Sequence, residues 1–264
     1  MGNHVGLGKA GYLCAVLLLI AVVAMAQDEE PLEADRPDLT EGATTVGHLR
    51  FHIETSFAWE RFDGDIEENE YFMSTLLRFG FGDHFEFLLE TDAFTRLDIG
   101  DDEDLTGFSP IAIGIRYNLF EGESIGDMTL GYIMMAEIPS GTDEFETEDT
   151  EVTMRLAAEW DFSETLSLGT NVGLESQTDD SGESFYSFLA SAVLGIAFDD
   201  QWGGLVEIAV DSAESDEGDA IWLFDVGLTF LVNPDLQLDV AAGTGLSGDE
   251  APDFFMTTGL SIRF

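Results

Sequence analysis

The residues of this chain that could carry chemistry are its charged ones, and they recur at alternate positions. Arg50, His52 and Glu54 are separated by the apolar residues Phe51 and Ile53, and later segments repeat this pattern. Side chains with a period of two point to opposite faces of a β-strand. One face of each strand is therefore apolar, and the other carries ions that could line an enclosed interior.

Enzymatic chemistry has few candidate residues here. A lipase-type or protease-type site needs a histidine beside a serine or an aspartate. Past the first few residues the histidines are His48, His52 and His84, two at the opening of the first strand and one in a short turn. Neither the apolar faces nor the long connections carry one. We expect no catalytic residue and no enzyme, and we expect His52 to bond an acid in the interior.

The long connections are rich in carboxylates, and three interpretations stay open. The D-x-D spacing of Asp63 and Asp65 offers oxygen ligands to divalent cations. Alternatively, the acid forms a negative funnel that enriches cations at a pore mouth, or it is a solvated surface that strong salt screening makes tolerable. No connection has the spacing of an EF-hand. We therefore assign no metal ligand and no cofactor.

Composition excludes several classes of protein. The 264 residues include 54 Asp and Glu against 9 Lys and Arg, for a formal net charge of -45. Such a charge repels nucleic acid, which requires a basic surface. A single cysteine cannot form a disulfide framework. Disorder is the usual consequence of high acidity, but 45% hydrophobic residues indicate that the chain hides much apolar surface.

The N-terminus has the features of a secretory signal peptide. An apolar stretch at 12–23 is too short to span a bilayer comfortably, and it is followed by the small-x-small sequence Ala24-Met25-Ala26. The alternative is a lipid anchor on Cys14, but a lipobox has its apolar stretch before the cysteine, whereas here most of it follows. We expect a signal peptide at 1–26, an acidic periplasmic segment at 27–45 and one barrel domain at 46–264.

Alternation extends through the rest of the chain, and the connections alternate between long and short. Long loops at one end and tight turns at the other are typical of outer-membrane barrels. The sequence therefore predicts an all-β protein, a transmembrane antiparallel up-and-down β-barrel with about 12 strands, long acidic extracellular loops and short periplasmic turns. The expected strands are 49–59, 71–81, 85–93, 111–119, 128–138, 152–162, 166–174, 186–198, 202–210, 222–232, 236–242 and 254–264.

The strand charges fall on one phase, which we take as the inner face, because an arginine in mid-bilayer costs about 2–4 kcal/mol. These ions could sort solutes in an open pore or form ion pairs that plug a narrow barrel, and the sequence leaves both open. The residues expected to line the lumen are Arg50, Glu54, Arg78, Glu86, Glu90, Arg96, Arg116, Glu137, Arg155, Glu159, Glu175, Glu207 and Asp239.

Aromatic residues mark the outer face and the chain end. All four tryptophans take the outward phase near strand ends, where an aromatic girdle belongs: Trp59, Trp160, Trp202 and Trp222. The chain ends on Phe264, which closes an alternating strand. By resemblance to outer-membrane proteins generally, a terminal aromatic residue is the signal that the barrel-assembly machinery reads.

Both ends of the expected barrel resemble a known family. Asp35-Arg36-Pro37-Asp38, followed by Thr40-Glu41-Gly42, resembles the opening segment of the MetA-pathway phenol-degradation family of outer-membrane proteins. The run from Asn233-Pro234-Asp235 to Gly259-Leu260-Ser261-Ile262-Arg263-Phe264 is similar to the last hairpin of that family. The usual proline pair before the first strand is absent at 45–48, and Arg50 stands where a neutral polar residue is more typical.

This resemblance implies a barrel associated with uptake of aromatic or other hydrophobic compounds, and it identifies no binding residue. We therefore expect a channel or transporter for small, hydrophobic or aromatic solutes in the outer membrane of a Gram-negative bacterium. The alternative is a non-transporting structural or surface-binding barrel whose acidic loops interact with cations. The expected partners are outer-membrane lipid, the barrel-assembly machinery and an unidentified small solute, with no nucleic acid.

Overall fold

A computed structural model describes residues 31–264 except 65, 101–102, 123, 125, 143–144, 148, 179–183, 213–218 and 249–250. The expected signal peptide at 1–26 lies outside these residues. In the described part of the chain, no helix is long and apolar enough to cross a membrane. All regular elements there are strands, as the alternation predicts.

The strands form one antiparallel sheet that closes on itself through pairing of the first strand with the last. Neighbouring strands follow one another in the order β15, β14 and so on down to β7, and then β4, β3, β1, β2, β5 and β6. Their bounds are β1 Phe51–Asp63, β2 Glu67–Phe72, β3 Thr75–Gly80, β4 Phe85–Thr91, β5 Phe94–Ile99, β6 Glu103–Phe108, β7 Ile111–Phe120, β8 Met128–Ile138, β9 Glu151–Ser163, β10 Leu166–Thr178, β11 Ser184–Ala197, β12 Trp202–Asp211, β13 Ile221–Asn233, β14 Leu236–Ser247 and β15 Phe254–Arg263.

Three of the wall strands are interrupted. β2 and β3 both pair with β1, at its two ends, so they are one wall strand broken at 73–74. In the same way, β4 and β5 are broken at 92–93, and β6 and β7 at 109–110. Each broken pair therefore counts once, and the wall is a closed barrel of twelve antiparallel strands, which confirms the predicted fold class.

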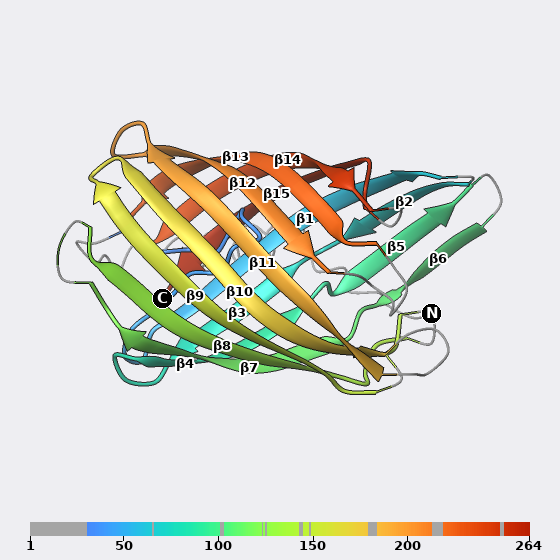
Figure 1. Ribbon diagram of the computed structural model, residues 1–264, viewed down its shortest axis with the longest axis horizontal. Coiled ribbons are helices and arrows are strands. Elements are labelled where there is room, and N and C mark those ends of the chain that lie inside the picture. The colour runs from blue at the N-terminus through green and yellow to red at the C-terminus, as the bar shows by residue number, and fades with distance from the viewer. Residues whose placement is uncertain are drawn as a thin grey trace, which may run out of the picture.

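Two regions expected to be loops contain strands. The connection expected between the strands at 49–59 and 71–81 includes the end of β1 and most of β2, and the connection expected between those at 85–93 and 111–119 includes β5 and β6, which pair with each other. Figure 1 shows β2, β5 and β6 extending at one end of the barrel. Polar residues occupy both faces of much of these segments, so the apolar alternation that signals a membrane strand is missing.

The apolar face of the barrel points outward. Val226 and Leu228 of β13 are 46% and 44% exposed, whereas Asp225 and Gly227, which alternate with them, face the interior, and Asp225 is 2% exposed. Trp202 and Trp222 are also exposed, and Trp59 packs against Phe254 with ring centroids 5.6 Å apart. In a water-soluble barrel the arrangement would be reversed. A lipid environment accounts for an apolar outer face of this size.

The break at 92–93 reverses the inward and outward phases, and this contradicts the expectation for Arg96. Ala93 has a left-handed backbone, with φ 43°. Beyond it, Arg96 pairs with Tyr71, which in turn pairs with the outward-facing Trp59. Thr95, by contrast, is 1% exposed. Arg96 therefore lies on the outer side of the extended strands and not in the lumen.

The C-terminus closes the barrel. The backbone N–H of Phe264 donates to the Phe51 carbonyl at 2.8 Å, and the Phe51 N–H donates to the Phe264 carbonyl at 3.3 Å. The two rings lie 6.3 Å apart. The short turns lie at this end of the barrel, which in outer-membrane barrels faces the periplasm. The role of Phe264 as an assembly signal stays a prediction.

Candidate functional site

The lumen is occupied by residues 31–46, which we call the plug. We expected residues 27–45 to lie in the periplasm, but the described part of this segment lies inside the barrel instead. Asp35, Thr40 and Ala43 are buried there. Among the described residues, one backbone–backbone hydrogen bond joins the plug to the wall, from Leu32 N–H to the Pro234 carbonyl at 2.7 Å. Side chains therefore make the other hydrogen bonds that hold it.

Two buried arginines of the wall meet one carboxylate of the plug. The Arg116 guanidinium donates to both oxygens of Asp35, at 2.6 Å and 3.1 Å. The Arg78 Nη1 lies 3.5 Å from the same carboxylate. Arg78 is also paired with Glu54 at 3.1 Å and with Glu86 at 3.0 Å. These charges have little access to water, so each depends on its partners for stabilisation.

The same wall residues satisfy backbone groups of the plug. Arg78 donates to the Glu33 carbonyl at 3.2 Å and to the Thr44 carbonyl at 3.1 Å. The Glu54 carboxylate accepts a hydrogen bond from the N–H of Asp35 at 2.9 Å, and the Glu86 carboxylate accepts one from the N–H of Val46 at 2.8 Å. A buried segment outside the sheet needs such partners, because an unpaired buried backbone group is costly.

Strands on the other side of the barrel hold the middle of the plug. Glu207 accepts the N–H of Leu39 at 2.7 Å and the hydroxyl of Thr40 at 2.5 Å. The side-chain amide of Asn171 accepts the N–H of Glu41 at 2.8 Å and donates to its carbonyl at 2.9 Å. The plug is therefore bound to the wall on several sides.

Arg36 fixes the plug at a further side of the lumen. Its guanidinium donates to Asp239 at 3.0 Å and to the hydroxyl of Thr257 at 2.6 Å. The side-chain amide of Gln237 donates to the carbonyl of Arg36 at 3.0 Å. β14 and β15 thus bind both the side chain and the backbone of one plug residue.

The two aspartates of the plug have opposite pKa shifts. Burial alone would raise the pKa of Asp35, but the Arg116 and Arg78 guanidiniums and the Gly42 N–H outweigh it and hold the pKa well below its usual value. Burial raises the pKa of Asp38 well above its usual value, and the neighbouring Glu207 and Asp225 carboxylates add to this shift. Docking of the plug therefore favours the ionised form of Asp35 and the protonated form of Asp38.

Cavities lie on both sides of the plug. On the periplasmic side, cavities of about 920 Å³ and 650 Å³ are both lined by Leu32, Glu33 and Thr44. On the extracellular side, cavities of about 430 Å³ and 350 Å³ adjoin each other and share Glu41. We call these two the outer chamber. The plug thus separates an outer from an inner part of the lumen.

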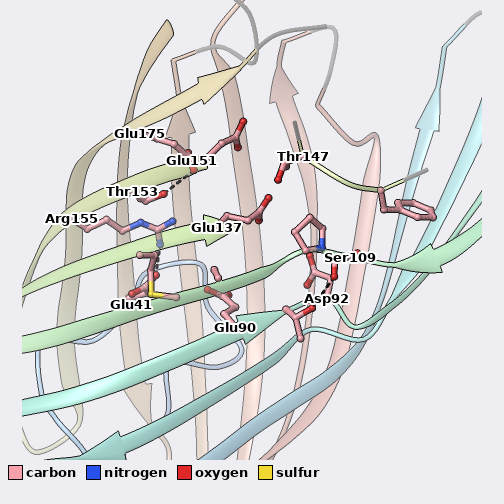
Figure 2. Close-up of a pocket in the computed structure, with 15 residues that line it drawn as sticks. Glu41, Glu90, Asp92, Ser109, Glu137, Thr147, Glu151, Thr153, Arg155 and Glu175 are labelled. Carbon is pink, nitrogen blue, oxygen red and sulfur yellow. Dashed lines mark hydrogen bonds and ion pairs between the residues drawn. The ribbon is translucent and has the colours of Figure 1, made fainter. Parts of the chain in front are cut away.

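The first cavity of the outer chamber is strongly acidic (Figure 2). Arg155 is the one basic residue among the described residues that line it, and its Nη1 donates to Glu41 at 2.5 Å. Thr153 donates to Glu175 at 2.8 Å. The carboxylates that line this cavity are Glu41, Glu90, Asp92, Glu137, Glu151 and Glu175.

The structure places all the predicted lumen residues except Arg96 in three groups. The first group is almost completely buried and in contact with the plug, and it consists of Glu54, Arg78, Glu86, Arg116, Glu207 and Asp239. Those that line the outer chamber are Glu90, Glu137, Arg155 and Glu175. Arg50 and Glu159 line the two periplasmic-side cavities. Arg96 lies outside, where it pairs with Asp98 at 2.5 Å and Asp104 at 3.3 Å.

The sequence reasoning missed the plug and its binding residues. Asp35 and Glu41 had been noticed only as part of a family-like run, and Asn171 was not singled out. The available signal was an acidic, irregular segment with one arginine, placed before strands whose inner faces carry unpaired ions. Across the described residues, no group of three or more His, Cys, Asp or Glu side chains is arranged to hold a metal ion.

Solved structures with a similar fold are barrels of the outer membrane. The COG4313 outer membrane channel from Pseudomonas putida F1 has a TM-score of 0.70 and 14% identity, over 88% of this chain and 100% of that one. The NanC porin has a TM-score of 0.53 and 9% identity, over 80% of this chain and 100% of that one. The KdgM porin has a TM-score of 0.53 and 11% identity, over 81% of this chain and 99% of that one.

At these identities the solved structures show the fold alone, which is that of an outer-membrane β-barrel. No curated protein matches the sequence. The family model for the MetA-pathway of phenol degradation matches residues 34–264, a range that includes most of the plug and the whole wall. The chain therefore belongs to the MetA-pathway phenol-degradation family.

Proposed function

We propose that this protein is an outer-membrane channel for small, hydrophobic or aromatic solutes, and that the plug closes its lumen until it is displaced. The observation that carries the proposal is the way the plug is held. It lies between two sets of cavities, outside the sheet, and polar side chains hold it. Water can replace such bonds when the plug moves, whereas a wall strand could not leave without breaking the barrel.

The composition of the outer chamber supports the proposed solute class. Its second cavity has an apolar wall that includes Leu76, Leu88 and Phe255 beside the polar plug. A cavity of this kind holds apolar solutes by excluding water and orients them with a few polar groups. The family is named for phenol degradation, which also favours an aromatic solute.

A second candidate is a barrel that transports nothing. The buried network around Arg78 and Arg116 favours this function, because its hydrogen bonds and ion pairs to the plug would stabilise the barrel wall without any need for transport. Single-channel recording in planar bilayers separates the two functions. A channel gives current steps, and liposomes that contain it take up a neutral aromatic solute such as phenol. A braced barrel gives no steps at any voltage and no uptake.

A reversible cross-link tests whether plug movement opens the path. The Thr40 and Ser191 hydroxyl oxygens lie 2.7 Å apart, one on the plug and one on β11. The double variant Thr40→Cys/Ser191→Cys should form a disulfide that fixes the plug to the wall. The chain's one native cysteine, Cys14, lies in the expected signal peptide. We expect oxidation to abolish current and phenol uptake, and dithiothreitol to restore both.

The two single-cysteine variants are the controls, and oxidation should leave their current unchanged. Current that persists in the oxidised double variant would show that solutes pass around the plug, and the displacement mechanism would then be wrong. Absence of current in every protein, oxidised or reduced, would favour the structural barrel.

A further inference from the structure

The outer chamber has many more carboxyl groups than basic side chains. In its first cavity the one guanidinium, that of Arg155, is already engaged by Glu41. Arg36 lines the second cavity but pairs with Asp239. Within the described residues, neither a hydrogen bond nor an ion pair involves the carboxylates of Glu90 or Glu137. Burial without a counter-charge favours the neutral form of such carboxyls, and a cation placed among them favours the ionised form, because charges interact strongly where the dielectric is low.

The floor of the chamber provides a second, independent sign of a missing cation. Asp225 lines the second cavity and is 2% exposed, yet neither of its carboxylate oxygens has a hydrogen-bond donor among the described residues. Its side chain meets that of another acid, Glu207, at hydrogen-bonding range, an arrangement that requires either a proton shared by the two acids or a cation. Ser56, on the same cavity, is 4% exposed and its hydroxyl also lacks a partner. Buried polar groups in native proteins almost always have partners.

The remaining lining of the chamber is apolar. Leu88 and Met135 belong to the buried hydrophobic cluster of the barrel, and Leu76 packs against that cluster. All three line the second cavity, and Met135 also lines the first. Figure 2 shows carboxylates from several strands turned toward one space. A ligand that fits must therefore place a positive group among acids and an apolar body against this cluster.

We propose that the outer chamber is a binding site for a small organic monocation with an apolar body, such as an aryl- or alkylammonium ion. This inference rests on the proposed channel function and names the solute class that the channel prefers. The two cavities, of about 430 Å³ and 350 Å³, lie in the size range of small-molecule sites.

Three probes of similar shape test the charge requirement: 2-phenylethylammonium, 2-phenylethanol and phenylacetate. Binding to the full-length protein in detergent is measured by titration calorimetry, and passage is measured by liposome uptake. We expect the ammonium ion to bind at least about ten-fold more tightly than the alcohol, which corresponds to about 1.4 kcal/mol. Phenylacetate should bind more weakly than the alcohol, since the chamber repels it.

A matched pair of variants locates the site. Glu90→Gln/Glu137→Gln removes two unpaired carboxylates of the chamber and should abolish the preference for the ammonium ion. The control, Glu164→Gln/Asp200→Asn, removes the same charge from exposed turns at the other end of the barrel. It should retain the preference. Heat-modifiable migration on gels verifies that each variant folds.

Failure of this inference is distinguishable from failure of the channel function. Equal binding of ammonium ion and alcohol, with uptake intact, would overturn the cation site and leave the channel standing. Selective ammonium binding without uptake of any probe would support the site and overturn the channel. If micromolar calcium binds in the chamber and 2-phenylethylammonium does not displace it, the site is for metal ions and the proposal is wrong.

Discussion

The Arg116 guanidinium and the Asp35 carboxylate form a two-bond ion pair inside the barrel, with bonds of 2.6 Å and 3.1 Å. The pair links β7 of the wall to the plug, and both residues are buried. Charge-assisted, two-bond pairs of this kind fix orientation as well as distance. The position of the plug in the lumen depends on this contact more than on any single neutral hydrogen bond.

Replacing Asp35 by Asn should loosen the plug. The variant leaves Arg116 and Arg78 buried with less negative charge to balance them, and breaking a buried pair typically costs about 3–5 kcal/mol. We expect a larger fraction of time in the conducting state in single-channel recordings. Asp98→Asn is the control, because it removes one carboxylate partner of an arginine, Arg96, that lies on the outer surface and not beside the plug. If the Asp35→Asn variant stays closed for the same fraction of time as the native protein, the ion pair does not hold the plug in place.

Opening should increase with pH because of Asp38. Its pKa in the docked plug is raised well above the ordinary 3.8, so docking favours the protonated acid. The protonated Asp38 stabilises the docked plug fully below pH 3.8, and this stabilisation is lost as the pH rises through the raised pKa. Asp35 has the opposite shift, and its contribution is lost only in strong acid.

We therefore expect the conducting fraction of the native protein to rise as the pH increases above about 4. The neutral Asp38→Asn variant should lack this component of the rise. Recordings in the same lipid at a series of pH values measure it. Overlapping pH profiles of the native protein and the variant would exclude Asp38 as the titrating group.

Gly131 should tolerate no larger side chain while the plug is docked. A Cβ built at this position of β8 would lie 2.7 Å from the Ala43 carbonyl oxygen and 2.9 Å from its Cα. These are backbone atoms of the plug, so the plug must move to relieve the contact. We expect Gly131→Val to raise the conducting fraction with the barrel intact. In Gly64→Ala, the control, the nearest atom is 3.6 Å away and the current should not change.

The cost of placing an arginine on the outer face should depend on how deep the residue lies in the bilayer. Val226 lies midway along β13 and is exposed on the apolar face, so Val226→Arg should lower the free energy of unfolding by about 2–4 kcal/mol. Tyr186, which is 82% exposed, lies near the extracellular end of β11. Tyr186→Arg should cost about 0–1 kcal/mol. Denaturant unfolding in lipid vesicles measures both, and equal costs would contradict the proposed membrane depth.

The alternation of apolar and polar residues was sufficient to predict the wall. It identified the twelve wall strands, their closure into a membrane barrel and the inner position of ions such as Glu54 and Arg116, because period two follows from strand geometry alone. It failed where that geometry is interrupted. One residue in the left-handed region, Ala93, reverses the faces beyond it, and no local signal in the sequence marks the break.

The tertiary structure alone decided where residues 31–46 lie and what the inner ions do. The plug has no periodicity, and its bonds join residues far apart in the chain, such as Asp35 with Arg116 and Thr40 with Glu207. Local patterns carry no information about such pairs. The sequence by itself determined that charges are confined inside the barrel, because lipid excludes them from the outer face. Which charges bind the plug and which stay unpaired in the outer chamber depends on distances that exist only once the barrel has closed.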